Sequence, residues 1–261
     1  MAQSVTVRVF EKAMSSELEE PGGKVRLFVK EALGDGERVM PDDAQAHYLL
    51  HVMRAKAGDR VSLFNGRDGE WLAKIAEVSK RSCVLKCEKQ TRVQEGTPDV
   101  WLCFAPIKKT PADYVVQKAT ELGVRALQPV FTRRTIVTRI NEERMRANAV
   151  EAAEQSERLT VPDIREAVTL DKLLKNWPAE RRILFCDEGG DARPIAEAVR
   201  NIKESTFAIL TGPEGGFDPA ERELIRSHAF VTPITLGPRI LRADTAALAS
   251  LTVLQALKGD W

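Results

Sequence analysis

Two glycine-containing segments, each lying between an apolar run of strand length and a helix, most constrain the fold of this chain. Thr211-Gly212-Pro213-Glu214-Gly215-Gly216-Phe217 follows the apolar residues 207–210. The second segment, residues 237–242, follows a predicted strand over 231–236. In open α/β sheets, the loops at the carboxyl ends of parallel strands form the ligand site. The sequence therefore predicts a parallel sheet whose two late loops share one pocket.

Throughout the chain after residue 96, predicted strands alternate with predicted helices. Apolar runs predict strands over 100–105, 125–131, 183–186, 207–210 and 231–236, and helices are expected over 110–121, 141–158, 195–202, 219–228 and 244–257. Thr110-Pro111 combines a capping hydroxyl with a first-turn proline, and Gly123 stops the same helix. Strands that alternate with helices are typical of a parallel sheet covered on both faces.

The first 95 residues are organised differently. Short strands are expected over 60–64, 70–75 and 82–87, separated by turns at Gly58-Asp59, Asn65-Gly66 and Asp68-Gly69. One helix is expected over 42–54, behind Pro41. This pattern predicts a small β-barrel, and the turn-rich residues 94–98 predict a boundary between domains 1–95 and 96–261.

Composition excludes several classes of protein. No apolar run is long enough to cross a bilayer, and acidic residues near the N-terminus argue against a targeting peptide, so a cytoplasmic protein is expected. The net charge of +1 is uninformative, but residues 96–146 carry nine basic against five acidic side chains. A basic segment of this kind indicates either contacts with phosphate groups or a helix face exposed to solvent.

Metal binding is not expected. The four cysteines lie in apolar, strand-like contexts, which favours buried reduced thiols. Cys83 and Cys87 are four residues apart, as are His47 and His51, but no third ligand type lies near either pair.

The chemistry of the two loops is open on these grounds alone. Glycines let main-chain groups approach a ligand closely, but they also serve in purely structural turns. Neither a Rossmann nor a phosphate-loop glycine pattern occurs, which disfavours a generic nucleotide-binding domain. Arg242 precedes a helix N-terminus, a position that favours anions. It either pairs with Asp244 or points at a ligand phosphate.

Taken together, the motifs resemble a known family. The first late motif is Gly212-Pro213-Glu214-Gly215-Gly216-Phe217, and the second is Leu236-Gly237-x-Arg239-Ile240-Leu241-Arg242-x-x-Thr245-Ala246. Two further motifs lie upstream: Gln117-Lys118-Ala119-Thr120-Glu121-Leu122-Gly123-Val124 and Glu151-Ala152-Ala153-Glu154-Gln155-Ser156-x-Arg158. His47-Tyr48-Leu49 and Val52-x-Arg54 complete the pattern near the N-terminus. This set, spread over almost the whole chain, resembles the SPOUT-class, RsmE-type ribosomal RNA (uracil-N3)-methyltransferases.

The resemblance implies an α/β fold with a C-terminal SPOUT domain, whose parallel sheet ends in a trefoil knot, and an N-terminal PUA-like β-barrel. It implies S-adenosyl-L-methionine (SAM) as cofactor, a homodimer, and ribosomal RNA or the small ribosomal subunit as partner. The implied SAM contacts are Leu210, Thr211, Gly212, Pro213, Glu214, Gly215, Gly216, Leu236, Gly237, Ile240, Leu241, Arg242, Thr245 and Ala246.

The resemblance also directs attention to arginines. Uracil N3 becomes nucleophilic only when its proton leaves, and an arginine near the carbonyl groups would stabilise the resulting charge. Arg134 is the leading catalytic candidate and Arg242 the second, while the neighbouring Arg133 keeps the choice open. The expected RNA contacts are Arg26, His47, Arg54, Lys108, Lys109, Arg133, Gln155 and Arg158.

Two alternatives follow from the same residues. One is a SPOUT methyltransferase that acts on another base, on a ribose hydroxyl or on transfer RNA. The other is an RNA-binding protein of this fold without catalytic activity, which the complete loops and the presence of Arg134 and Arg242 disfavour.

Overall fold

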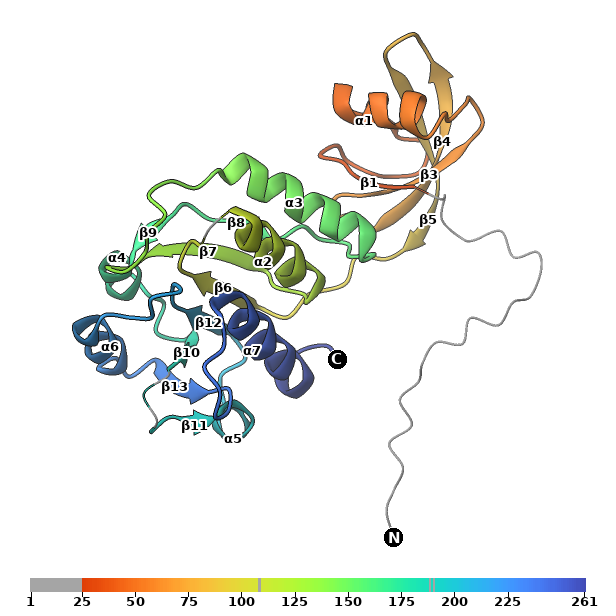
Figure 1. The fold of residues 1–261 in the computed structure, drawn as a ribbon. Coiled ribbons are helices and arrows are strands. Elements are labelled where there is room, and N and C mark those ends of the chain that lie inside the picture. The colour runs from red at the N-terminus through yellow and green to blue at the C-terminus, as the bar shows by residue number, and fades with distance from the viewer. Residues whose placement is uncertain (1–24, 108, 188, 190) are drawn as a thin grey trace.

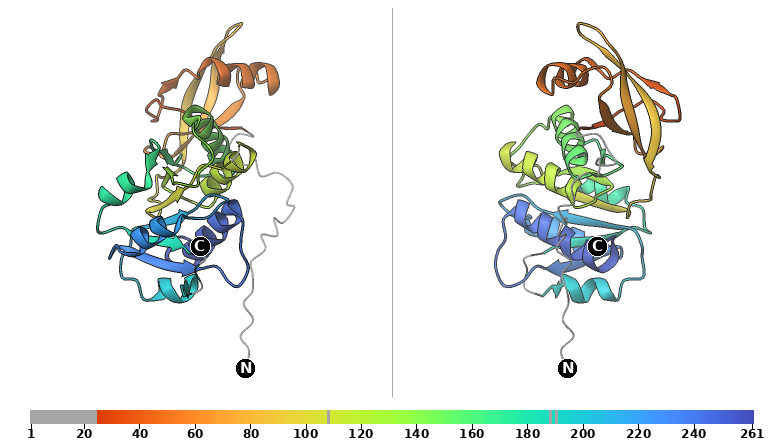
Figure 2. Two further views of the ribbon diagram at one scale, coloured as in Figure 1. Left: turned by 60° about the vertical axis from the view of Figure 1, so that its left-hand side comes forward. Right: turned by 90° about the vertical axis from the view of Figure 1, so that its right-hand side faces the viewer.

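The computed structural model describes residues 25–107, 109–187, 189 and 191–261. Figure 1 shows a smaller sheet at one end of the molecule and a larger sheet with its helices at the other, and the two further views in Figure 2 show the same stacking. The long helix α3 (Glu142–Gln155) extends from the larger unit to the smaller one, where it packs against β1 (Arg26–Phe28). The two units therefore share a packed contact.

The smaller unit is built on a curled, five-stranded sheet with the order β1-β3-β4-β5-β2. Its elements after β1 are β2 (Arg38–Val39), α1 (Asp43–His47), the π-helical turn η1 (Tyr48–Val52), β3 (Arg60–Phe64), β4 (Glu70–Val78) and β5 (Cys83–Arg92). The β4–β5 pair contains register shifts, which bend a sheet and help it to curl. The predicted small barrel is thus present as this curled sheet around one apolar core.

The larger unit holds an eight-stranded sheet in which every recorded pair is parallel. Its main path is β11-β13-β10-β12-β6-β7-β8, and β9 pairs with β7. The strands are β6 (Val100–Phe104), β7 (Ala126–Phe131), β8 (Asp163–Ile164), β9 (Val168–Thr169), β10 (Arg182–Cys186), β11 (Arg193–Pro194), β12 (Phe207–Thr211) and β13 (Val231–Thr235). The predicted parallel sheet is confirmed.

Helices cover both faces of this sheet. Besides α3, they are α2 (Lys109–Glu121), α4 (Leu170–Lys175), α5 (Ile195–Arg200), α6 (Pro219–Arg226) and α7 (Ala243–Lys258). Consecutive strand residues point to opposite faces. Accordingly, Leu184 and Ile209 lie in the core that α2, α3, α5 and α7 cover, whereas Phe185 and Leu210 lie in the core with α4 and α6.

The last part of the chain crosses earlier parts. The crossover from β10 to β12 carries α5, and β13 then pairs on the other side of β10. From there α7 returns across the sheet to pack against α5, α2 and β12 (Figure 1). This is the chain path expected for the knotted domain.

Most elements begin and end within a few residues of the sequence-based expectation. The elements that the sequence did not predict are short. The strands among them have two or three residues each and are β1, β2, β8, β9 and β11, and the helix α4 has six. Elements this short carry too little periodicity to stand out in a sequence. The helix expected over 42–54 is present as α1, which then widens into the π-helical η1.

The cysteines behave as expected of reduced thiols. Cys83, Cys87 and Cys103 are buried and free, and Cys186 is free and partly buried. Burial raises the pKa of the Cys103 thiol to about 12. In the part of the chain that the structure describes, no three His, Cys, Asp or Glu side chains come together as metal ligands would. None of the helices described there is long and apolar enough to cross a membrane.

Candidate functional site

Three neighbouring parallel strands bring the glycine-containing segments to one edge of the sheet. The order is β13-β10-β12, so the loops after β12 and β13 leave the same edge with only the loop after β10 between them. This confirms that the two segments lie at one edge of the sheet, while a pocket shared by them stays a prediction. It also adds a third loop, which begins at Asp187 and which the motifs did not single out.

The first loop is tightly built and has an exposed tip. Thr211 is buried, and its carbonyl accepts from the N–H of Ala105 at 3.0 Å. A Cβ at Gly212 would lie 2.7 Å from the ring of Phe217, so glycine is needed for this ring to close over the loop. The N–H of Gly216, at φ +66°, donates to the carbonyl of Pro213 at 2.9 Å. Glu214 and Gly215 are exposed at the tip.

The second loop presents apolar and polar groups together. Gly237 has φ +110°, a conformation that favours glycine. Leu236 and Leu241 are partly buried, but Ile240 is 84% exposed. Within the described residues, the N–H groups of 239–241 bond to no other main-chain group. The loop therefore offers apolar surface beside free main-chain donors, which suits a flat ligand with polar edges.

Arg242 stands at the N-cap of α7, and its side chain is exposed. Its main-chain carbonyl accepts from Ala246 at 2.8 Å, which begins the helix, but its side chain makes no capping bond. The carboxylate of Asp244 instead accepts from the N–H of Thr245 at 2.7 Å. Among the described residues there is no ion pair between Arg242 and Asp244. Of the two interpretations of Arg242, the pairing with Asp244 is not formed, and the role toward a ligand stays a prediction.

A turn after β7 brings two arginines to the first loop. The turn is closed by the N–H of Thr135, which donates to the carbonyl of Thr132 at 3.1 Å. Arg134 donates from its guanidinium to the carbonyl of Gly215 at 3.0 Å. Arg133 points instead to the start of α6, where it bonds Asp218 at 3.0 Å. Of the pair, only Arg134 touches the glycine-containing loop.

Comparisons with known proteins agree with this geometry. A family model of the RNA methyltransferase domain matches residues 94–255, and one of the RNA methyltransferase PUA domain matches residues 41–88. Ribosomal RNA small subunit methyltransferase E of Rickettsia conorii is 32% identical over 89% of this chain and 95% of its own length. The chain belongs to the ribosomal RNA small subunit methyltransferase E family. The Bacillus subtilis member of this family is 30% identical over 83% of this chain and 90% of its own length.

A solved structure from the same family shows the fold with a ligand. The ribosomal RNA small subunit methyltransferase E of Neisseria gonorrhoeae, bound to S-adenosyl methionine, matches with a TM-score of 0.82. It is 27% identical, and the match covers 91% of this chain and 99% of that one. The domain architecture of this family member is therefore that of a methyltransferase with a PUA domain.

Two arginines that were predicted to contact RNA have other partners. Arg26 bonds Glu70 at 2.7 Å and donates to the carbonyls of Ala153, Glu154 and Arg158 at 2.9–3.0 Å. The guanidinium of Arg158 donates to Thr120 and Val124 carbonyls, and burial lowers its pKa to about 10. Most of their donors are used inside the protein, although Arg158 Nε is buried without a partner among the described residues. Arg26 joins the two domains, whereas the side chain of Arg158 bonds within the larger one, and we withdraw both from the RNA site.

The remaining predicted RNA contacts lie on the surface or outside the description. His47 and Arg54 are exposed on the small domain, and Gln155 is exposed at the end of α3. Arg54 has φ +54°, which is uncommon for a residue with a Cβ. Lys108 and the side chain of Lys109 lie outside the described residues.

Proposed function

We propose that this protein transfers the methyl group of SAM to N3 of a uridine in small-subunit ribosomal RNA. Its relatives carry the name of that ribosomal RNA enzyme, and the Neisseria gonorrhoeae relative binds SAM. The observation that carries the proposal is the contact of Arg134 with Gly215, because it sets a cationic side chain beside the loop that would hold the methyl donor. The uracil-N3 target itself rests on the resemblance of the sequence motifs.

The two loops suit SAM by their chemistry. Free main-chain donors at 239–241 fit the edge of an adenine, and the exposed Ile240 fits its apolar face. When bound, SAM supplies a methyl group already activated by a sulfonium. The residues that we propose to surround it are Leu210, Thr211, Gly212, Pro213, Glu214, Gly215, Gly216, Leu236, Gly237, Ile240, Leu241, Arg242, Thr245 and Ala246.

The proposed work of the protein is alignment and charge stabilisation. Holding the acceptor base against the methyl donor removes most of the entropic cost of the reaction. Loss of the N3 proton places negative charge on the uracil carbonyl oxygens, and Arg134 is well suited to stabilise it because a guanidinium is a permanent donor. Arg242, exposed and without a recorded partner among the described residues, is the second candidate for this role.

We propose that both domains, 1–95 and 96–261, hold the RNA. His47, Arg54 and Gln155 are exposed and could contact phosphate or base, and Arg133, although paired with Asp218, is 65% exposed. Lys108 and Lys109 belong to the same proposal on grounds of sequence alone. We expect the protein to act as a homodimer in the cytoplasm. Partly exposed alanines of α7 and the exposed Leu257 and Trp261 at its end would suit a helix contact between copies.

One experiment tests the activity. The protein is incubated with labelled SAM and either assembled small ribosomal subunits or naked ribosomal RNA, and the modified nucleoside is identified by mass spectrometry. We expect 3-methyluridine. A methyl group on another base or on a ribose would support the wider SPOUT alternative. SAM binding without transfer to any RNA would support a non-catalytic RNA-binding protein. Light scattering on the same sample gives the mass that tests the dimer.

A further inference from the structure

The strand order gives the proposed SAM pocket a third wall. β10 lies between β12 and β13, and all three are parallel. The segment that follows β10 must therefore emerge between the two glycine-containing loops. Of this segment the structure describes Asp187, Gly189 and the residues from Asp191 onward. At its two ends the main chain is joined to β13, since the N–H of Asp187 donates to the carbonyl of Ile234 at 2.9 Å and β11 pairs with β13. Between these points, side chains supply a further attachment.

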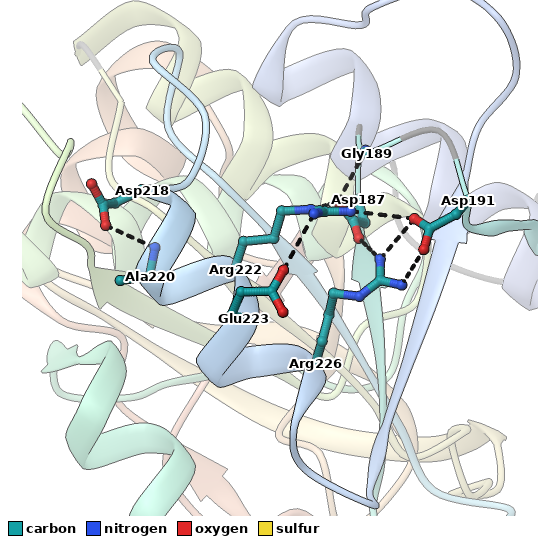
Figure 3. A network of polar contacts seen from close by, with 8 residues as sticks. All are labelled: Asp187, Gly189, Asp191, Asp218, Ala220, Arg222, Glu223 and Arg226. Carbon is teal, nitrogen blue, oxygen red and sulfur yellow. Dashed lines mark hydrogen bonds and ion pairs between the residues drawn. The ribbon is translucent and has the colours of Figure 1, made fainter.

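A network of ion pairs ties this segment to α6. Figure 3 shows Arg222 and Arg226, one turn apart on α6, pointing together toward Asp187 and Asp191. Arg222 Nε donates to Asp187 Oδ1 at 2.7 Å, and Arg226 donates to Asp187 Oδ2. Arg226 also reaches Asp191 Oδ2 at 2.6 Å. Both carboxylates of the segment are thus held by the same two side chains.

The centre of this network is buried. The side chain of Asp187 is only 2% exposed, and its Oδ1 also accepts from the N–H of Gly189 at 3.1 Å. A Cβ on Gly189 would lie 1.7 Å from the guanidinium of Arg222, so the arginine lies directly on the main chain of the segment. A buried carboxylate requires such partners, because an unpaired buried charge is strongly unfavourable. The network therefore holds Asp187, Gly189 and Asp191, the described residues of the segment, against α6.

The same helix is attached to the first loop. α6 begins at Pro219, directly after the 211–217 loop, and Asp218 caps it by accepting from the N–H of Ala220 at 3.0 Å. Arg222 and Arg226 follow within the next two turns. α6 and its two arginines therefore connect the first loop to Asp187 and Asp191.

We propose that Arg222 and Arg226 are positioning residues for SAM, which hold the segment after β10 against α6 as the third wall of the cofactor pocket. This inference rests on the proposed function. The two arginines act through Asp187 and Asp191 and need not touch the cofactor. Their loss would loosen the pocket without removing any group that takes part in methyl transfer.

The test measures SAM affinity by titration calorimetry for the wild type, Arg222→Ala and Arg226→Ala, with circular dichroism to verify folding. We expect the Kd for SAM to rise about tenfold or more, and KM for SAM to rise similarly, while kcat at saturating SAM changes by less than about threefold. A merely structural role would lower the melting temperature without this split between KM and kcat.

Arg182→Ala is the matched control. Arg182 lies at the amino end of β10, the strand that precedes the segment. Its side chain is 22% exposed, against 23% for that of Arg226, and it pairs with Glu204. It should lose comparable thermal stability with an unchanged Kd for SAM. If either α6 variant fails to fold, Asp191→Ala replaces it, because the Asp191 side chain is 63% exposed and its removal frees one end of the segment. We expect that variant to weaken SAM binding about threefold.

The outcomes are separable. If the wild type binds SAM while the α6 variants bind it equally well, or if Arg182→Ala weakens binding to the same extent, the positioning role is overturned and the proposed function stands. If the wild type does not bind SAM, the proposed function fails and this inference fails with it.

Discussion

At the scale of single residues, neighbours in the sequence can have quite different surroundings. Arg133 and Arg134 are adjacent in one turn, and both are exposed. Arg133 is paired with Asp218, and its N–H donates to Glu221 at 2.8 Å, so it supports the start of α6. Arg134 meets a main-chain carbonyl of the proposed cofactor loop, and no carboxylate pairs with it among the described residues. A guanidinium without a counter-ion is free to meet negative charge on a substrate.

We therefore expect Arg134→Ala to lose turnover by about 100-fold or more, as removal of one charge-stabilising donor does in other enzymes. The Kd for SAM should change by less than about threefold, because the lost contact with Gly215 is a single exposed hydrogen bond. Single-turnover methylation and calorimetry check the two quantities.

Arg133→Ala is the matched control for the chemical step: because Arg133 is proposed to contact RNA, KM for RNA should rise, whereas turnover at saturating RNA should largely be retained. A collapse of SAM binding in Arg134→Ala, with turnover at saturating SAM preserved, would mean that Arg134 holds the loop and does not act on the base.

At the scale of elements, two helices beside the proposed pocket begin in opposite ways. α6 has a complete capping box, formed by Asp218 and Glu221, with proline in its first turn. α7 begins at Arg242, a cation at the end of the helix that favours anions, and the side chain makes no capping bond. Local stability does not explain an arginine at this position, which agrees with the role toward a ligand that we propose for Arg242.

Arg242→Ser should consequently stabilise the fold of the protein but impair its methyl transfer. A serine cap in place of a non-capping residue adds about 0.5–1 kcal/mol to the free energy of unfolding. Methyl transfer should fall by about tenfold or more, since one cationic donor of the proposed site is lost. Urea unfolding and the methylation assay measure the two effects. Unchanged methylation in the more stable variant would remove Arg242 from the site.

At the scale of the whole molecule, a small polar cluster joins the two domains. Arg26 of β1 crosses to the end of α3, where it meets two carbonyls of that helix and that of Arg158. Glu154 of α3 makes a second contact with β1, because its carboxylate accepts from the N–H of Phe28 at 2.9 Å. Burial raises the pKa of Glu154, against the opposing effects of that N–H and of the Arg26 charge. These contacts attach the small domain to the end of α3.

Arg26→Ala should lower the free energy of unfolding by about 3 kcal/mol, because it leaves Glu70 and the α3 carbonyls without their buried partner. Hydrogen exchange should show the small domain opening separately from the large one. The matched control is Arg38→Ala, which breaks an exposed pair with Glu77 and should change stability by less than about 1 kcal/mol. Equal losses in the two variants would argue against a special role of Arg26.

The sequence alone determined much of this molecule. Strands such as β3 and β12, helices such as α6 and α7, and the loops between them follow from periodicity, glycine and capping residues, all of which act over a few neighbouring positions. For the same reason the sequence predicts that the two glycine-containing loops lie at one edge of a parallel sheet. The family resemblance then supplied the knot and the identity of the cofactor, which local patterns do not carry.

Tertiary structure alone decided what individual polar side chains do. Arg26, Arg158 and Arg134 are equally basic in the sequence, yet two are used inside the protein and one reaches a loop 81 residues away. The segment after β10 enters the proposed site only because its strand lies between β12 and β13. Sequence patterns report the preferences of a residue among its neighbours in the chain, whereas the partner of a charge depends on which distant backbone the fold brings within about 3 Å.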